Sequence, residues 1–356
     1  MKRSNIRNID EIILFNIETD LDSQVLGSNV YWVEEFRKYF KIVTVVSTHL
    51  GSVHKYKNVK YIETGGGNFK NRLSAIFRLI VLLFYIFEKR KCIFIFYHMS
   101  TKPLFILGFF ARIFKVRQAL WYSHSKADVF LRLSRTLPNY FFSPTLESFP
   151  LKNKDRVIRT NHAIPIRTLT ESLSIGKNRN GILSVGRVVK IKNLENIISA
   201  VRLTKSMQKV LIDFIGPLNK DLKYEIHLKE LATTNNVNLN ISGPVNYLEI
   251  LELYKKYDLY FSGTPKSIDK ATIEAAISGC LVITECKDAQ YLTGMDYVWD
   301  QLRLVDRNNI VEQLNLLSEL NVSQKEFYRS YISQKAASMN NIESTISDIS
   351  RIIKNS

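Results

Sequence analysis

Residues 181–201, GILSVGRVVKIKNLENIISAV, decide the fold because they predict a strand, a basic turn and a helix in close succession. The apolar run Ile182–Val185 is typical of a short buried strand, and the apolar spacing from Leu194 onward predicts an amphipathic helix. Open α/β sheets bind anions where a strand ends and a helix begins, so this stretch predicts an anion site. A solvated surface loop is the alternative. The candidate anion ligands in the turn are Gly186, Arg187, Lys190 and Lys192.

The same alternation of strand and helix continues downstream. Apolar runs predict strands at 182–185, 210–215, 239–242, 259–262 and 281–284. Apolar residues at helical spacing predict helices near 194–205, 221–234, 247–257 and 270–278, and again from 309 to the end. Such alternation is typical of a parallel sheet with helices on both faces.

The first half of the chain shows a second, similar alternation. Its predicted strands are 12–17, 42–47, 61–63, 92–97, 119–122, 140–143 and 157–159. Its predicted helices are 30–40, 71–87, 103–114 and 129–136. With 356 residues, the chain is too long for one ordinary core, so two domains are expected.

The boundary between these domains is predicted near residue 170. Residues 163–180 lose periodicity and gain Pro, Gly, Ser and charge, which indicates a linker. We therefore expect an N-terminal α/β domain at 1–170 and a C-terminal α/β domain at 171–356. The last helix, Ile342–Ile353, has an isoleucine face that must pack on something, and the N-terminal domain is one candidate.

The positive charge of the chain is concentrated in one region. The formal net charge is +17, and residues 51–180 contain 23 Lys and Arg against 6 Asp and Glu. A field of one sign predicts an anionic partner, either membrane lipid, nucleic acid or an acidic substrate. No RNP-type motif or zinc-finger spacing accompanies it, so nucleic acid is not expected as a partner.

The same region contains the apolar run Leu79–Phe87. Its nine residues are too few to cross a bilayer, which takes about 20. We expect a helix that is buried against the sheet, and contact with a membrane surface is the alternative.

Cysteine usage and the N-terminal residues predict a cytoplasmic protein. Cys92, Cys280 and Cys286 are odd in number and lack metal-ligand spacing, which favours a reducing compartment. The N-terminus reaches Asp10 and Glu11 before any apolar run, which does not resemble a secretory signal. Peripheral attachment to the inner face of the cell membrane is compatible with the basic region.

A second cluster of candidate ligands lies at 262–279, SGTPKSIDKATIEAAISG. A strand ends at Ser262, and Asp269 is expected to be the N-cap of the next helix. Glu274 is the one acidic residue on a small, apolar helix face; it can accept hydrogen bonds from a ribose diol, or it is a surface glutamate. The amides that can bind an oxyanion are those of Lys266, Ser267 and Ile268.

Both clusters resemble a known family. SVGRVVKIKN, DFIGP, YLEILELYKKYDLYFSGT and IEAAISGCLVIT resemble, in order and spacing, the C-terminal domain of family 4 (group 1) retaining glycosyltransferases of the GT-B fold, of the bacterial surface-polysaccharide type. In the N-terminal half, the matching positions are Gly27, which belongs to a glycine-rich turn, and His98, His124 and His162, which end strands.

The resemblance implies an α/β architecture of two Rossmann-like domains that face each other across a cleft. It implies that Arg187 and Lys192 bind the diphosphate of the donor, and that Glu274 contacts the ribose. The first glutamate of the family's Glu-x7-Glu motif is replaced by Lys266, and Asp269 is a candidate substitute. His124 matches the histidine that faces the reacting sugar.

The resemblance implies a retaining glycosyltransferase of hexosyltransferase type, active in bacterial polysaccharide or glycolipid assembly. We expect it to move a sugar from a nucleotide-diphosphate sugar to a hydroxyl of a saccharide or a lipid-linked saccharide. No metal or other cofactor is expected, because cations and helix-terminal amides can neutralise the diphosphate. The alternatives are a nucleotide-sugar epimerase or phosphorylase of the same fold, or a catalytically silent membrane-associated binding protein.

Overall fold

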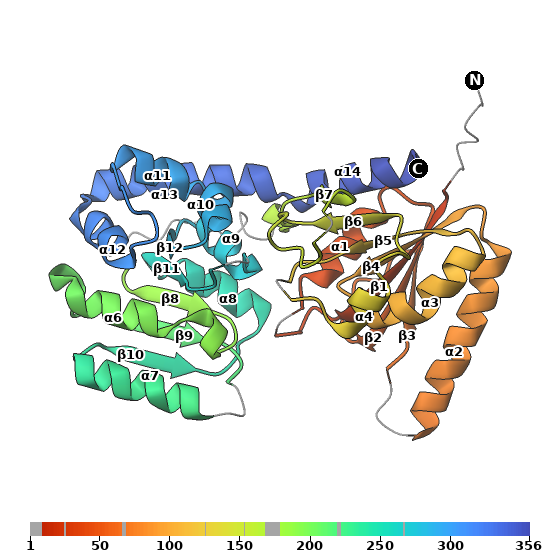
Figure 1. The fold of residues 1–356 in the computed structure, drawn as a ribbon, viewed down its shortest axis with the longest axis horizontal. Coiled ribbons are helices and arrows are strands. Elements are labelled where there is room, and N and C mark those ends of the chain that lie inside the picture. Colours follow the sequence, from red (N-terminus) through yellow and green to blue (C-terminus); the bar gives the residue numbers. More distant parts are fainter. Residues whose placement is uncertain are drawn as a thin grey trace. The chain divides into compact units, whose positions relative to one another are not determined.

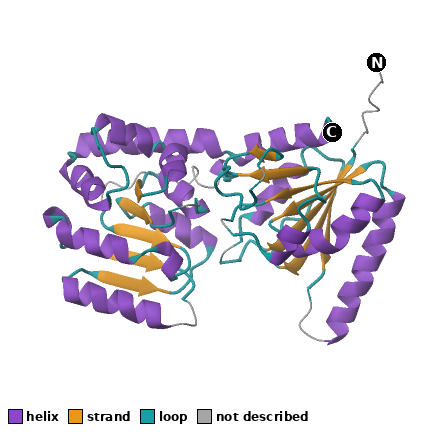
Figure 2. Cartoon of the chain, viewed as in Figure 1, coloured by secondary structure: helices purple, strands orange, loops and turns teal. Residues whose placement is uncertain are grey.

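The computed structural model of the chain describes residues 9–24, 26–65, 69–124, 126–152, 154–167, 179–218, 222–265 and 268–356. The chain forms two compact units (Figures 1 and 2). Unit 1 is Met1–Ala163 with Ile342–Ser356, and unit 2 is Ile164–Asn341. The sequence placed the division at 170 and counted the last helix with the C-terminal domain. Of the expected linker, residues 168–178 lie outside the described part of the chain.

Unit 1 is built on a parallel sheet of seven strands, in the order β3-β2-β1-β4-β5-β6-β7. The strands fall where apolar runs predicted them, and most of their residues are buried, as expected of a sheet covered on both faces. Their bounds are β1 Glu11–Thr19, β2 Ile42–Leu50, β3 Val59–Glu63, β4 Ile93–His98, β5 Arg117–Trp121, β6 Tyr140–Ser143 and β7 Val157–Arg159.

Helices cover both faces of this sheet because alternate side chains of each strand point to opposite sides. Ile12 and Leu14 of β1 share one core with α1 and α14. Ile13 and Phe15 share the other core with α2, α3 and α4. The bounds are α1 Asn29–Phe36, α2 Phe69–Glu88, α3 Thr101–Ile113, α4 Val129–Leu133 and α14 Ile342–Lys354.

The apolar helix around Leu79–Phe87 packs against the sheet, as expected, but it is buried on one face only. Leu82 and Ile86 of α2 are buried, but Phe77 is 66% exposed and Phe84 is 71% exposed. The helix packs on the sheet with one face only, and the rest of its apolar circumference is open. Among the described residues, none of the helices combines the length and the apolar character that a membrane crossing requires.

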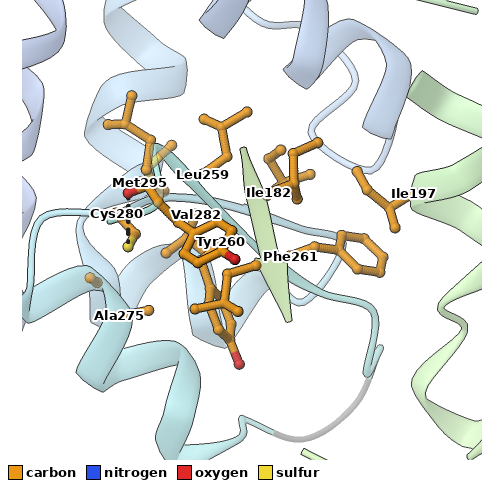
Figure 3. Packing of buried hydrophobic residues seen from close by; sticks show 14 of the residues in the cluster. Ile182, Ile197, Leu259, Tyr260, Phe261, Ala275, Cys280, Val282 and Met295 are labelled. Carbon is orange, nitrogen blue, oxygen red and sulfur yellow. Dashed lines mark hydrogen bonds between the residues drawn. The ribbon is translucent and has the colours of Figure 1, made fainter. Parts of the chain in front are cut away.

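Unit 2 contains a five-stranded parallel sheet, in the order β10-β9-β8-β11-β12. Every residue of β9, β11 and β12 is buried, which explains why most of them are apolar. The exception is Asp213 of β9, whose carboxylate accepts hydrogen bonds from Asn240 and Tyr257. Figure 3 shows part of the core around Ile182, Phe261 and Val282. The bounds are β8 Ile182–Val185, β9 Ile212–Ile215, β10 Leu239–Ser242, β11 Leu259–Ser262 and β12 Leu281–Thr284.

The helices of unit 2 include two short ones, α10 Lys287–Thr293 and α11 Met295–Gln301, that the sequence did not predict. They are separated by Gly294, which is left-handed at φ +85°, and neither is long enough for a helical period to stand out. The others are η1 Lys190–Lys192, α6 Glu195–Leu203, η2 Lys205–Met207, α7 Leu222–Asn235, α8 Tyr247–Tyr254, α9 Lys270–Ile277, α12 Ile310–Glu319 and α13 Val322–Asn340.

The strand order fixes where each sheet can bind a ligand. In unit 2, chain order reverses between β8 and β11, and in unit 1 it reverses between β1 and β4. Open parallel sheets bind ligands at such switch points, outside the carboxyl ends of the strands. The loops after β8 and β11 are therefore the place to look for the anion site.

Candidate functional site

Glycines let the loops after β8 and β9 approach each other closely. The N–H of Gly186 donates to the carbonyl of Ile215 at 2.9 Å. Gly216 has φ +152°, and a Cβ on it would lie 2.2 Å from the carbonyl oxygen of Gly186. Only glycine fits at position 216. Because it has no side chain, the backbones at Gly186 and Gly216 can touch, and this contact holds the loop after β8 in place.

Lys192 joins the loop after β8 to the loop after β11. Its ammonium forms an ion pair with the carboxylate of Asp269, which also accepts a hydrogen bond from the hydroxyl of Thr264 at 3.1 Å. The side-chain amide of Asn193 donates to the carbonyl of Gly263 at 3.1 Å. These contacts bring the two sequence clusters, 181–201 and 262–279, into one site at the switch point of the sheet.

Asp269 occupies the N-cap position of α9, as the sequence predicts, but its side chain does not cap the helix. It binds Lys192 and Thr264 instead. The side chain is 31% exposed, so solvent reaches the ion pair. Sequence pattern alone cannot reveal this, because the competing partner lies 77 positions away in the chain.

Arg187 differs from Lys192 in having no such partner. Its side chain is exposed, and it makes no hydrogen bond or ion pair with the described residues. Lys190 is exposed in the same loop and likewise has no ion-pair partner there. Gly186, Arg187 and Lys192 thus lie at the carboxyl end of β8. Arg187 is open to solvent, and Lys192 is neutralised by Asp269.

Glu274 is buried on α9, at 4% exposure. Its Oε1 accepts a hydrogen bond from the Tyr247 hydroxyl at 2.8 Å and contacts the Lys270 ammonium at 3.0 Å. The Tyr254 hydroxyl lies 3.5 Å from Oε2. Burial, followed by the nearby carboxylate of Glu274, raises the pKa of Tyr254 well above its ordinary value. The alternative of a plain surface glutamate is therefore wrong.

The oxyanion-binding loop is described only in part. Lys266 and Ser267 lie outside the described residues. Ile268 is described, and its side chain is buried in the core of unit 2. The role predicted for the three amides stays a prediction.

His124 in unit 1 is exposed and lies three residues beyond the end of β5. The backbone N–H of Lys126 donates to its Nδ1 at 3.1 Å, and its own N–H donates to the carbonyl of Ser148 at 3.1 Å. Because Nδ1 accepts a hydrogen bond, the neutral ring carries its proton on Nε2. His124 can therefore donate a hydrogen bond outward from Nε2.

The other N-terminal positions of the resemblance are buried. His98 ends β4 and stacks on Trp32, with 4.2 Å between ring centroids, and its Nδ1 lies 3.3 Å from Asn16 Oδ1. His162 is 4% exposed. Gly27 is buried in the turn before α1, where its carbonyl accepts from the N–H of Val30 at 3.4 Å. Burial favours a structural role for the two histidines.

One group in unit 1 could hold a metal ion, and sequence analysis passed over it. Ligand atoms of Glu18, Asp20 and His49 lie within 4.8 Å of one another, in the part of the chain that the structure describes. Asp20 Oδ1 already accepts from the N–H of Ser52 at 2.8 Å and from the N–H of Asp22 at 3.1 Å. These bonds give the carboxylate a role in the loop, and nothing else points to an ion there.

Comparison with known proteins matches the part of the chain that contains both sequence clusters. Residues 166–284 match the family model described as glycosyl transferases group 1. No curated protein matches the sequence significantly.

Three solved structures illustrate the fold. HepE from Anabaena, in complex with UDP and glucose, is 12% identical and has a TM-score of 0.67, covering 96% of this chain and 99% of that one. A glycosyltransferase from Rickettsia africae is 13% identical, with a TM-score of 0.66 and coverage of 98% and 100%. Sucrose-phosphate synthase from Thermosynechococcus elongatus is 11% identical, with a TM-score of 0.68 and coverage of 97% and 98%.

These findings agree with the resemblance at the level of family and fold. The family match covers the loops after β8 and β11, and the structural likeness covers nearly the whole chain. Residues 166–284 thus match the group 1 glycosyltransferases, and the chain has the GT-B fold, built from two units that each contain a parallel sheet.

Proposed function

We propose that the protein transfers a sugar from a nucleotide-diphosphate sugar to an acceptor hydroxyl with retention at the anomeric carbon. The observation that carries the proposal is that two cations, Arg187 and Lys192, lie in the loop at the switch point of the unit 2 sheet. A guanidinium fork and an ammonium at the carboxyl end of one strand suit a diphosphate. That HepE binds UDP, and UDP-glucose in another crystal, supports the same donor class.

In this proposal the donor diphosphate competes with Asp269 for Lys192. The ion pair keeps the ammonium near the end of β8 while the site is empty of anion. A diphosphate bound by Arg187 brings more negative charge than one carboxylate and can draw Lys192 toward itself. Both cations then stabilise the charge that develops on the leaving diphosphate. No metal is part of this proposal.

Glu274 is proposed to bind the ribose. A carboxylate has about four acceptor positions, and the contacts with Tyr247, Tyr254 and Lys270 leave room for one more donor. The side chain of Lys270 is 30% exposed, and that of Glu274, which it contacts, is 5% exposed. A ribose hydroxyl would reach Glu274 by moving this lysine.

His124 is proposed to contact the reacting sugar or the acceptor. Its exposed ring presents Nε2–H while Nδ1 is held by Lys126, so its orientation is fixed by the backbone. A fixed donor of this kind can bind a sugar hydroxyl or a carbonyl that gains charge during transfer.

The acceptor is proposed to be lipid-linked, with the enzyme bound peripherally to an anionic cytoplasmic leaflet during polysaccharide or glycolipid assembly. Unit 1 exposes large apolar side chains on three consecutive helices, which we call the apolar face. The Phe87 and Phe114 rings meet at 5.0 Å between α2 and the end of α3, and Phe105 and Phe130 meet at 5.7 Å between α3 and α4. The face comprises Ile76, Phe77, Ile80, Val81, Phe84, Phe87, Phe105, Ile106, Phe109, Phe110, Ile113, Val129 and Leu133.

Charge around the apolar face supports this partner. Arg78, Lys89, Lys102 and Arg112 are exposed on or beside the same helices. An amphipathic surface with aromatic residues and flanking cations is typical of proteins that lie on anionic membranes. Residues 51–163, which belong to this unit, contain 20 Lys and Arg against 5 Asp and Glu.

The test of the proposed function is a two-step screen. A thermal-shift panel of UDP, GDP and ADP and their sugars identifies the nucleotide, since a ligand that binds only the folded state raises Tm. The matching nucleotide sugar is then incubated with a lipid-extract acceptor, and the anomeric configuration of the product is determined by NMR. Retention supports the proposal. Inversion, or an altered free nucleotide sugar without transfer, contradicts it.

A further inference from the structure

A second anion site is suggested by a cavity of unit 1 that plays no part in the site above. Its volume is about 720 Å³, and it lies among α4, β6 and the segment before β7. Half of its lining residues are cations, and none is acidic. The cations are Lys126, Arg132, Arg135, Lys152 and Arg156.

None of the five forms an ion pair with a carboxylate in the described part of the chain. Two acidic residues, Asp128 and Asp155, adjoin lining residues in sequence; the carboxylate of Asp128 accepts from the N–H of Leu131 at 2.7 Å and from the hydroxyl of Thr101 at 2.6 Å. Five like charges around one cavity repel one another, so a bound polyanion would relieve an unfavourable field.

The five cations favour a group with more than one negative charge, such as a phosphate or diphosphate. Arginine binds phosphate oxygens in a bidentate fashion, and three of the five cations are arginines. Arg156 is partly committed, because its guanidinium donates to the carbonyls of Pro138 and Asn139 and lies 5.6 Å over the Phe141 ring. Arg132, Arg135 and the two lysines are exposed and can turn toward a ligand.

The floor of the cavity is apolar. Phe141, Pro150 and Leu151 contribute carbon atoms beside the cations. A volume of this size is typical of sites for organic ligands rather than for a single inorganic ion. The combination fits a phosphate or diphosphate ester whose organic part lies on the apolar floor.

The cavity is connected to both proposed acceptor elements of unit 1. Its Lys126 donates the backbone hydrogen bond that orients His124. Its Arg132 lies on α4, between Val129 and Leu133 of the apolar face. A phosphate held here would therefore tether an acceptor beside His124 and next to the membrane-facing helices.

We propose that this cavity binds the phosphate or diphosphate group of a phosphorylated acceptor. That the ligand is an acceptor rests on the proposed function. Two sources share this chemistry. One is a lipid phosphate whose chain continues onto the apolar face, and the other is a water-soluble phosphate ester. The binding itself requires no donor nucleotide.

The experiment is calorimetry on the full chain with inorganic diphosphate and with geranyl diphosphate, a short prenyl ester. All proteins carry Arg187→Gln, so that the unit 2 site contributes little. The pocket variant adds Arg132→Gln with Lys152→Gln, two exposed cations from different walls of the cavity. The control adds Lys55→Gln with Lys57→Gln, two exposed cations of unit 1 outside the cavity. If the double variant does not fold, as judged by circular dichroism, Lys152→Gln alone replaces it.

We expect the pocket variant to bind both probes about tenfold or more weakly, since each lost charge-assisted bond weakens binding by roughly that factor. The control should stay within about twofold of the parent. Geranyl diphosphate that binds at least about tenfold tighter than inorganic diphosphate indicates the lipid source, and similar affinities indicate the soluble one. Equal loss in pocket and control variants, or no binding by the parent, overturns the proposal.

The same double variants, made without Arg187→Gln, are titrated with the nucleotide found in the thermal-shift panel. Unchanged nucleotide affinity together with lost diphosphate affinity assigns the effect to the cavity. If none of the proteins binds a nucleotide, the proposed function is contradicted. The two diphosphate titrations would still show whether the cavity binds a phosphate group.

Discussion

Two cations in one loop of unit 2 differ in their availability, and this difference decides their roles. Arg187 is exposed and makes no contact with a carboxylate of the described chain, whereas Lys192 is paired with Asp269. An anion that arrives at the end of β8 meets Arg187 first. Lys192 joins only after leaving its carboxylate, so we infer that Asp269 holds this lysine in place and also weakens nucleotide binding.

Asp269→Asn should therefore tighten the binding of the nucleoside diphosphate. Removing the carboxylate frees Lys192 for the diphosphate, and a gain of a few-fold in affinity is expected for a solvent-exposed pair. Calorimetry with the unsugared nucleotide is the measurement, because it avoids any role of Asp269 toward the sugar. Asp348→Asn, an exposed change of equal charge in unit 1, is the control. Weaker binding by Asp269→Asn alone would contradict the inference.

Cysteine reactivity offers a second test at this scale. Burial raises the pKa of the Cys280 thiol to about 12, and burial also raises the pKa of Cys286. Cys92 is only half-buried. DTNB at pH 8 should label Cys92 quickly and the other two only after unfolding.

The same shift has a consequence for stability. The folded state keeps the Cys280 proton, whereas the unfolded chain releases it above a pKa of about 9. The thiol therefore lowers the free energy of unfolding as pH rises from about 9 to about 12.

The labelling prediction would be contradicted if DTNB reacted rapidly with all three thiols of the native protein at pH 8, because the core around Cys280 would then be open.

At the residue scale, the sequence predicts which side chains gather but not their partners. Gly186, Arg187 and Lys192 follow a recognisable strand, so their place at its carboxyl end is predictable. The pairing of Lys192 with Asp269, and that of Glu274 with Tyr247, depends on the order of strands and helices in space. No local pattern encodes these contacts.

Glycine contacts fix the site at the scale of elements. The backbone after β9 touches the backbone after β8 at Gly216, and the loop after β11 touches Lys192 at Gly263, where a Cβ would lie 2.2 Å from the Lys192 carbonyl. A single sequence does not mark these glycines as special, because Gly243 lies in a similar loop after β10 and has open space around it.

Gly216→Ala should displace the loop after β8. The added Cβ meets the Gly186 carbonyl, and φ +152° is unfavourable for alanine, so we expect a cost of about 2 kcal/mol or more. A thermal melt should show unit 2 losing roughly 4–8 °C in Tm, together with weaker nucleotide binding. Gly243→Ala is the matched control and should change neither. Identical melts for the two variants would mean that the loops do not touch.

Helix α2 illustrates where sequence analysis falls short for elements. Its apolar character all round predicts a helix, and the helix is present, but the pattern does not tell a buried helix from one that opens an apolar face. The strands and the longer helices were predictable because their periods are unambiguous. α10 and α11, which have seven residues each and are divided by Gly294, were not predicted.

Phe77→Ser with Phe84→Ser should reduce binding to anionic vesicles. These rings are among the most exposed apolar side chains of α2, and losing them removes apolar area without disturbing the core. Sedimentation with phosphatidylcholine vesicles that contain phosphatidylserine is the measurement, and we expect at least a tenfold drop in affinity, roughly 1.5 kcal/mol or more. Leu222→Ser with Val322→Ser, both exposed on unit 2, is the control. Equal binding by all three proteins would contradict a membrane role for the apolar face.

For the whole molecule, charge is divided between the two units. Residues 51–180 carry nearly all of the net positive charge, and they make up most of unit 1. Unit 2 holds a local cationic loop in a nearly balanced background. This division suits a protein whose first unit meets anionic surfaces or acceptors and whose second unit binds one anionic donor.

The central claim is that the loops after β8 and β11 bind the donor diphosphate, and one calorimetric comparison tests it most directly. The wild-type chain, Arg187→Ala and Arg202→Ala are titrated with UDP, GDP and ADP. Arg202 is exposed in the last turn of α6, at the opposite end of that helix from the loop, and serves as the control. We predict that one nucleotide binds and that Arg187→Ala alone weakens it tenfold or more, at roughly 1.5–3 kcal/mol for a lost charged hydrogen bond. Equal affinity of all three proteins, or no binding of any nucleotide, would contradict the account.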